Sequence, residues 1–479
     1  MIGRKTLVAL VTLGLLAAVP ASSGAQPTTS PPTTSTHYTG TLPDGGSWIA
    51  DVPSPWNGTL LLYSHGYGST APADSPDPVT QQDLLNEGYA MAGSSYDPNG
   101  SLWQLGSAVS DQFESLAAVE RTVLPHRPRD VIAVGTSMGG LISSLESEQA
   151  YRRIDGSLTT CGIVAGGLRL GNYQLDGEYA INQLLAGDSV QLVDYSGPTG
   201  AADSFTAADE LGAAATSAQQ TPQGRARLAL AMSLMNTTTW STQPGAVPPA
   251  PTDYAGQEQE QYDTDFGPAP PGFPPLTVME FIETGRQQIE LAAGGNPNWT
   301  AGVDFKKLVN RSPYKPEIEA LYQAAGLNLD ADLRTLTRNA DIKADIPAER
   351  WIERTSDNTG RLQVPELDLH TIADQLVPVQ QENSYRHTVR SAGRAELLRQ
   401  AFVDRQVHCN FTPSELVAGV HAIQYRIDTG RWSHVADPAS LNAAAAQSGL
   451  GPSAFIPGYE PARLSGDNGP FDPFAQGIW

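Results

Sequence analysis

A serine framed by two glycines, Ser137, is the feature that most constrains the fold of this chain. It stands in the stretch Gly135-Thr136-Ser137-Met138-Gly139, between an apolar run at 129–134 and a helix-like segment at 140–146. Glycines on both sides permit a turn so tight that the serine backbone is strained and its hydroxyl projects from the edge of a sheet. The helix start beneath the serine favours negative charge that develops there. The pattern predicts an α/β fold with Ser137 as a nucleophile.

The chain on either side of this turn alternates between strand and helix patterns. Unbroken apolar runs at 59–64, 89–94, 131–134 and 161–166 are typical of strands covered on both faces. Residues 107–123 carry apolar side chains at helical spacing. Such alternation predicts a parallel sheet with helices on both sides.

The pattern changes near residue 175. Residues 175–345 contain helical stretches and a proline-rich run at 244–275, and strand patterns return only after residue 363. We interpret 175–345 as a mostly helical insertion in one sheet domain formed by 37–174 and 346–479. A separately folding second domain is the alternative.

A serine hydroxyl needs a base to take its proton, and the base needs an acid to hold its tautomer. Asp374 follows an apolar run that ends at Leu369, so we expect its carboxylate at the same sheet edge as Ser137. Asp404, immediately after another predicted strand, is the alternative acid. Asp368 lies inside a predicted strand and is not favoured.

His408 is the predicted base. It lies in a loop after the predicted strand at 395–403 and before a helix whose first residues, Thr412 to Glu415, carry a capping signature. We interpret His65 as a residue that orders its loop. The histidines taken as core or surface residues are His126, His370, His387, His421 and His434.

The stretch His65-Gly66-Tyr67-Gly68 supplies a fourth part. Serine chemistry of this kind needs one backbone N–H from the residue after the serine, here Met138, and a second from an earlier loop. Tyr67 is the predicted second donor, because the flanking glycines permit a sharp bend. A glycine turn without a functional role is the alternative.

These four features, in their order along the chain, resemble the α/β-hydrolase superfamily over roughly residues 38–175 and 346–435. The resemblance implies an eight-stranded, mostly parallel sheet with a cap inserted after the sixth strand, where 175–345 falls.

The same resemblance implies roles for individual residues. Ser137 is then the nucleophile, Asp374 the orienting acid and His408 the base. The segments around Cys161 and Cys409 are similar to those of exported bacterial hydrolases in which a disulfide braces the histidine loop.

The first 25 residues are typical of a secretory signal peptide. A charged start precedes an apolar run at 7–19 and small residues at 23–25. The run is too short to span a bilayer, and a retained anchor is the alternative reading. Residues 26–36 form a linker rich in proline and threonine, and we expect ordered structure to begin near His37.

The composition excludes several classes of partner. A formal net charge of -22 argues against nucleic acid and against anionic membranes, and we expect no stable membrane insertion. Cys161 and Cys409 are the only cysteines, so an exported chain is expected to pair them in a disulfide. No metal-binding motif is present, and we expect neither a metal nor a cofactor.

The predicted function is that of a secreted serine hydrolase. We expect it to cleave carboxylic esters, of a small molecule or a polymer, through an acyl-enzyme intermediate. A serine peptidase of aminopeptidase type and an acyltransferase are the alternatives, because the same residues serve all three. A non-catalytic binding protein is the reading least favoured by the residues present.

The insertion is predicted to act as a lid over Ser137, with the 244–275 run as an extended, partly mobile strap. Acidic residues in that run could grip a peptide amino terminus, but we interpret them as a solvated loop; they are Glu258, Glu260, Asp263 and Asp265. Aromatic residues of the insertion could line a substrate pocket or form the insertion's own core; they are Trp240, Tyr254, Tyr262, Phe266, Phe273, Phe281 and Trp299.

Overall fold

The computed structural model describes residues 34–97 and 100–466. Its strands are β1 (Thr34–Thr41), β2 (Ser47–Ser54), β3 (Thr59–Ser64), β4 (Ala90–Ser94), β5 (Asp130–Thr136), β6 (Gly156–Thr160), β7 (Glu366–Ala373) and β8 (Leu398–Gln406). Its helices are α1 (Pro78–Asn86), α2 (Ala108–Thr122), α3 (Met138–Glu148), α4 (Gly167–Leu184), α5 (Gly200–Ala218), α6 (Pro222–Leu234), α7 (Tyr254–Asp265), α8 (Val278–Ala293), α9 (Phe305–Arg311), α10 (Lys315–Ala324), α11 (Leu329–Asn339), α12 (Ile346–Thr355), α13 (Gln380–Ser391), α14 (Pro413–Thr429) and α15 (Pro438–Ser448).

The strands form one sheet in the order β1-β2-β4-β3-β5-β6-β7-β8. β1 and β2 pair antiparallel, as do β2 and β4, and every other neighbouring pair is parallel. The expected eight-stranded, mostly parallel sheet of the α/β-hydrolase fold is therefore confirmed. The carboxyl ends of the parallel strands lie at one edge, where ligands of such sheets bind.

Apolar side chains point alternately to the two faces along the central strands, which explains why helices cover both faces of the sheet. Leu61 and Ile132 lie in a cluster with residues of α14, whereas Leu60 and Val131 lie in a cluster with residues of α2. Successive side chains of a strand point to opposite faces, so an unbroken apolar run serves two cores.

Two boundaries differ from the sequence-based expectation. β1 begins at Thr34, so the last residues of the predicted 26–36 linker pair with β2. The predicted strand at 161–166 is wrong, because the sixth strand is Gly156–Thr160. The apolar character of 161–166 comes from burial in a loop that leads into α4. The predicted signal peptide, 1–25, lies outside the described residues.

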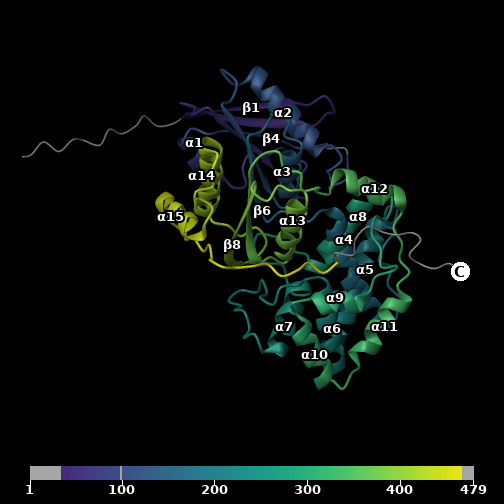
Figure 1. Cartoon of the computed structure of the whole chain (residues 1–479). Helices are drawn as coiled ribbons and strands as arrows, with labels where there is room; N and C mark the ends of the chain where they lie inside the picture. The colour runs from purple at the N-terminus through teal and green to yellow at the C-terminus, as the bar shows by residue number, and fades with distance from the viewer. Residues whose placement is uncertain (1–33, 98–99, 467–479) are drawn as a thin grey trace, which may run out of the picture. The chain divides into compact units, whose positions relative to one another are not determined.

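The segment between β6 and β7 holds helices α4 to α12, and Figure 1 shows α5 to α11 gathered away from α1, α14 and α15. Its apolar core is continuous with α3, since Leu141 and Ile142 share a cluster with residues of α4 and α6. Among the residues that the structure describes, no helix has the length and apolar character that crossing a membrane requires.

The proline-rich run is not extended throughout, which corrects the prediction for 244–275. Its middle forms α7, and the side chain of Asp253 caps this helix by accepting the N–H of Gly256. Prolines occur at both ends of the run but not between residues 252 and 267. The interval without proline is therefore free to form a helix.

Candidate active site

Ser137 lies at the turn between β5 and α3, with φ 60° and ψ -121°. A non-glycine residue at positive φ is strained and needs support from its surroundings. The two framing glycines provide it: a Cβ on Gly135 would lie 1.9 Å from the carbonyl oxygen of Gly139, and one on Gly139 would lie 1.9 Å from that of Ser64. The strained turn leaves the Ser137 hydroxyl at the carboxyl edge of the sheet.

His408, in the loop after β8, lies next to this hydroxyl. Its Nε2 is 2.8 Å from Oγ of Ser137, and its Nδ1 donates to Oδ2 of Asp374 at 2.6 Å. The backbone N–H of His408 donates to the side chain of Gln375 at 2.7 Å. An imidazole held in this way can take a proton from the serine and return it to a leaving group.

Asp374 follows the last residue of β7 and is fully buried. Its Oδ1 accepts the N–H groups of Leu376 and Val377 at 2.9 and 2.8 Å. Burial on its own raises the pKa of Asp374, but the neighbouring His408 and His370 outweigh it and hold that pKa below its usual range. Asp374 therefore carries a negative charge toward His408.

Asp404, the alternative acid, does not lie in this group. It is part of β8, and its side chain is exposed. β8 extends to Gln406, further than the predicted strand, which carries Asp404 into the strand and away from a loop position.

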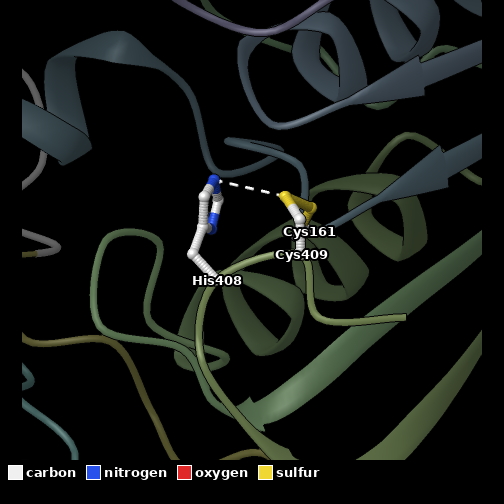
Figure 2. A group of neighbouring side chains, drawn as sticks. All are labelled: Cys161, His408 and Cys409. Carbon is white, nitrogen blue, oxygen red and sulfur yellow. Dashed lines mark hydrogen bonds between the residues drawn. A yellow bond between two sulfur atoms is a disulfide. The ribbon is translucent and has the colours of Figure 1, made fainter. Parts of the chain in front are cut away.

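A disulfide joins Cys161 to Cys409, with the two Cα atoms 5.3 Å apart. Figure 2 shows the ring of His408 beside this bridge, with Nε2 3.3 Å from Sγ of Cys409. Cys161 follows β6 and Cys409 follows His408, so the bridge ties the histidine loop to the centre of the sheet. Within residues 34–97 and 100–466, these three side chains are the one cluster with the spacing of a metal site, but disulfide sulfurs are not thiolate ligands.

The loop after β3 passes beside the serine. A Cβ placed on Gly66 would lie 3.3 Å from Cβ of Ser137. The ring of Tyr67 packs edge-on against Phe281 of α8, with centroids 5.6 Å apart. His65 stacks on Tyr96 at 4.2 Å, and its Nδ1 lies 2.8 Å from the carbonyl oxygen of Gly66, which fits its expected role in ordering the loop.

A cavity of about 60 Å³ opens above Ser137 and His408. Mostly apolar side chains line it, from helices α4 and α8 and from the loops after β3, β4, β6 and β7; they are Tyr67, Trp103, Ile163, Leu170, Gln174, Phe281, Ile282, Gly285, Arg286, Ile289, Leu376 and Val377. α8 supplies the largest share of this lining. The insertion therefore forms one wall of the space that a substrate would enter.

Arg286 is a buried charge in this wall that the sequence did not reveal. Its guanidinium donates to Glu178 of α4 at 2.5 Å, although 108 residues separate the two along the chain. Burial opposes charge on Arg286, but Glu178 and Glu283 keep its pKa above the ordinary value. Burial also raises the pKa of Glu290, on the same helix, to about 7.

The acidic residues of the proline-rich run do not form a solvated loop, so that interpretation is wrong. They lie on α7, where Glu258 is buried against Arg225 and Asp265 is buried against the hydroxyl of Thr237. Internal partners occupy these carboxylates, which leaves little reason to assign them to a peptide amino terminus.

The aromatic residues of the insertion divide between the two roles considered for them. Phe281 lines the cavity, and the ring of Phe273 lies 6.4 Å from that of His408. Trp299 is buried in the apolar core of the insertion, and Tyr262 stacks on Phe266 at its margin.

No family model matches this chain. Among curated proteins it is similar to o-phthalyl amidase of Xanthobacter agilis, with 28% identity over 440 residues that cover 88% of this chain and 93% of the amidase.

The solved structures that align with this chain are less similar to it in sequence. Feruloyl esterase B of Aspergillus oryzae aligns at 12% identity and a TM-score of 0.40, covering 82% of this chain and 80% of the esterase. An acylaminoacyl peptidase of Pyrococcus horikoshii aligns at 10% identity and a TM-score of 0.35, covering 79% of this chain but only 38% of the peptidase. The assignment of the fold therefore rests on the strand order and pairing described above.

Proposed function

We propose that this protein, with its α/β-hydrolase fold, is a secreted serine hydrolase that cleaves carboxylic esters. The observation that carries the proposal is the position of His408, whose two ring nitrogens lie 2.8 Å from the Ser137 hydroxyl and 2.6 Å from the Asp374 carboxylate. A serine activated by a base that a buried acid orients is the arrangement that acyl transfer requires.

In the proposed reaction, Oγ of Ser137 attacks the ester carbonyl as its proton passes to Nε2 of His408. The tetrahedral intermediate collapses when His408 returns this proton to the leaving alcohol, which leaves an acyl group on Ser137. Water, deprotonated by His408, then attacks the acyl-enzyme and releases the acid. Asp374 stabilises the imidazolium that forms in each half of the reaction.

The backbone N–H groups of Met138 and Tyr67 are the proposed donors to the oxyanion. Met138 is the first residue of α3, where unpaired N–H groups and the helix dipole favour negative charge. One such donor contributes about 3 kcal/mol to transition-state stabilisation in serine hydrolases. The mostly apolar cavity lining favours an acyl group that is mainly apolar.

Amide hydrolysis is the second candidate. The likeness to o-phthalyl amidase, at 28% identity over most of both chains, favours it. The same residues would act, with His408 protonating an amine instead of an alcohol. Secretion is part of the proposal, supported by the disulfide, since such bonds persist mainly in oxidising compartments.

Replacing Ser137 with alanine tests the proposal. The parent should hydrolyse short-chain aryl esters or aryl amides, and the ratio of the two rates decides between the candidates. Ser137→Ala should lower kcat by a factor of about 10⁴ or more. Ser189→Ala, which alters an exposed serine whose hydroxyl donates to the carbonyl of Ala186, is the matched control and should keep the parent rate. Equal rates in the parent and Ser137→Ala would contradict the proposal.

A further inference from the structure

A second histidine lies beneath the proposed site and has no part in the reaction above. His370, in β7, is fully buried. Its Nε2 is 2.8 Å from the carbonyl oxygen of Val377, and its Nδ1 is 2.8 Å from Oε1 of Glu382. A carbonyl oxygen only accepts hydrogen bonds, so Nε2 must carry a proton.

The surroundings of Glu382 place a proton on Nδ1 as well. Its Oε2 accepts the side-chain N–H of Gln400 at 2.6 Å, so Glu382 accepts at both oxygens when His370 donates to Oε1. Burial and the nearby Glu382 raise the pKa of Asp368 well above its usual value, so Asp368 keeps its proton beside Glu382. His370 is then an imidazolium paired with one carboxylate.

His370 also contacts the acid of the proposed site. Its Nε2 lies 3.6 Å from Oδ2 of Asp374, the same oxygen that accepts from His408. Val377 joins the two residues a second time, because its N–H donates to Asp374 while its carbonyl accepts from His370. Burial opposes protonation of His370, but the carboxylates of Asp374 and Glu382 outweigh it and raise its pKa to about 10.

We propose that His370 is a positioning residue of this site: a buried imidazolium, anchored by Glu382, that fixes the 374–377 loop and offsets part of the Asp374 charge felt by His408. The inference rests on the function proposed above. An unopposed Asp374 carboxylate would make His408 hold its proton to higher pH, and a protonated His408 cannot act as a base. His370 thereby extends activity toward lower pH.

Several other groups lie around Glu382 and Asp374, on the elements that pack against them. Asp368 and Glu366 come from β7, Gln400 from β8 and Tyr173 from α4. Burial raises the pKa of Glu366 to about 7, so this carboxyl titrates within the working range. Its contribution is common to the parent and to variants at His370, and a comparison of the two removes it.

The test is the pH profile of kcat/KM for His370→Gln between about pH 5 and 9. Glutamine can still donate to the Val377 carbonyl but carries no charge. We expect the acid limb of the profile to move upward by about half a unit to one unit, with KM little changed. His421→Gln, which alters an exposed histidine of α14 paired with Glu87, should leave the limb in place. A folded His370→Gln protein with an unmoved acid limb overturns the proposal.

Removing His370 leaves Glu382 buried without its partner, so the single variant could fail to fold. The double variant His370→Gln/Glu382→Gln removes both charges, and it should move the acid limb in the same direction but by less, because the lost Glu382 charge has the opposite effect on His408. Nitrogen NMR of the parent gives a readout that needs no activity: at about pH 8 both ring nitrogens of His370 should carry protons. One unprotonated nitrogen overturns the inference, whereas a protein without hydrolytic activity overturns only the proposed function.

Discussion

At the scale of single residues, the hydrogen bonds of Asp374 direct one of its carboxylate oxygens to His408. Two backbone N–H groups occupy Oδ1, and His408 occupies Oδ2. These bonds fix the plane of the carboxylate and leave Nδ1 of His408 as the protonated nitrogen. The unprotonated Nε2 then faces Ser137, which is the tautomer a general base requires.

Asp374→Asn should therefore remove activity without removing the fold. Asparagine keeps the size of the side chain but loses its charge, and its amide can present a donor to Nδ1, which favours the wrong tautomer. We expect kcat for the best ester or amide substrate to fall by a factor of about 10⁴. Asp404→Asn, which alters the exposed aspartate on β8, is the control and should retain the parent kcat. An unchanged rate in Asp374→Asn, or an equal loss in both variants, would contradict this assignment.

The sequence could place some of these residues and not others. Ser137, Asp374 and His408 each follow a strand pattern, and the carboxyl ends of parallel strands meet at one edge. His370 was interpreted as a core or surface residue, because a histidine within a strand carries no local sign of a role in a site. Arg286 has a partner more than a hundred residues away, and nothing local to either residue signals that pairing.

At the scale of elements, a strand could be predicted from the sequence where the most apolar residues of a segment are also the residues that form the strand. β3 agrees with its predicted bounds, because its residues are apolar and covered on both faces. The predicted position of β6 was too far along the chain, because Gly156–Thr160 is weakly apolar and the loop that follows it is more apolar. The sequence predicted that the insertion is mostly helical, but it did not predict α7, because prolines flank that helix on both sides.

α8 is the element whose substitution should change substrate preference. Gly285 lies within this helix and lines the cavity, and a Cβ placed on it would meet no atom within 4 Å. Gly285→Ala should raise the unfolding free energy by about 0.5–1 kcal/mol, because glycine is a poor helix former. Gly285→Phe should fill the cavity and lower kcat/KM for bulky acyl groups more than for acetyl.

Gly212 of α5 offers a matched control for this prediction. It is also helical and also has open space around its Cβ position, but it does not line the cavity. Gly212→Ala should give a similar gain in stability without any change of substrate preference. If Gly285→Phe keeps the parent ratio of rates for long and short acyl groups, α8 does not form the wall of the acyl site.

At the scale of the whole molecule, the acidic character of the chain continues into its interior. Of its 51 aspartate and glutamate residues, several are buried with pKa values raised to between about 6 and 8, or well above the usual value; they include Asp74, Asp111, Glu146, Asp265, Glu283, Glu290, Glu317, Glu366 and Asp368. Each binds its proton more tightly in the folded than in the unfolded chain. By linkage, each makes folding less favourable as the pH rises through that interval.

Glu317 of α10 allows this effect to be measured at one position. It is fully buried, and neither carboxyl oxygen has a hydrogen-bond partner in the described part of the chain. Burial, with a smaller contribution from Glu258, raises its pKa from 4.5 to about 8. The folded state keeps this proton between those two values while the unfolded state releases it, so stability is full below pH 4.5 and is lost as the pH approaches 8.

Glu317→Gln should therefore have little effect on the free energy of unfolding at acid pH and should make that free energy fall less as the pH rises. Urea unfolding should give similar free energies for parent and variant at about pH 5, and a variant more stable by about 2–4 kcal/mol at about pH 8. Glu319→Gln, on the same helix but exposed and paired with Lys315, should leave the slope of the parent unchanged. If the Glu317→Gln and parent curves run parallel from about pH 5 to 8, Glu317 is already ionised in the folded protein and a neighbouring group must compensate its charge.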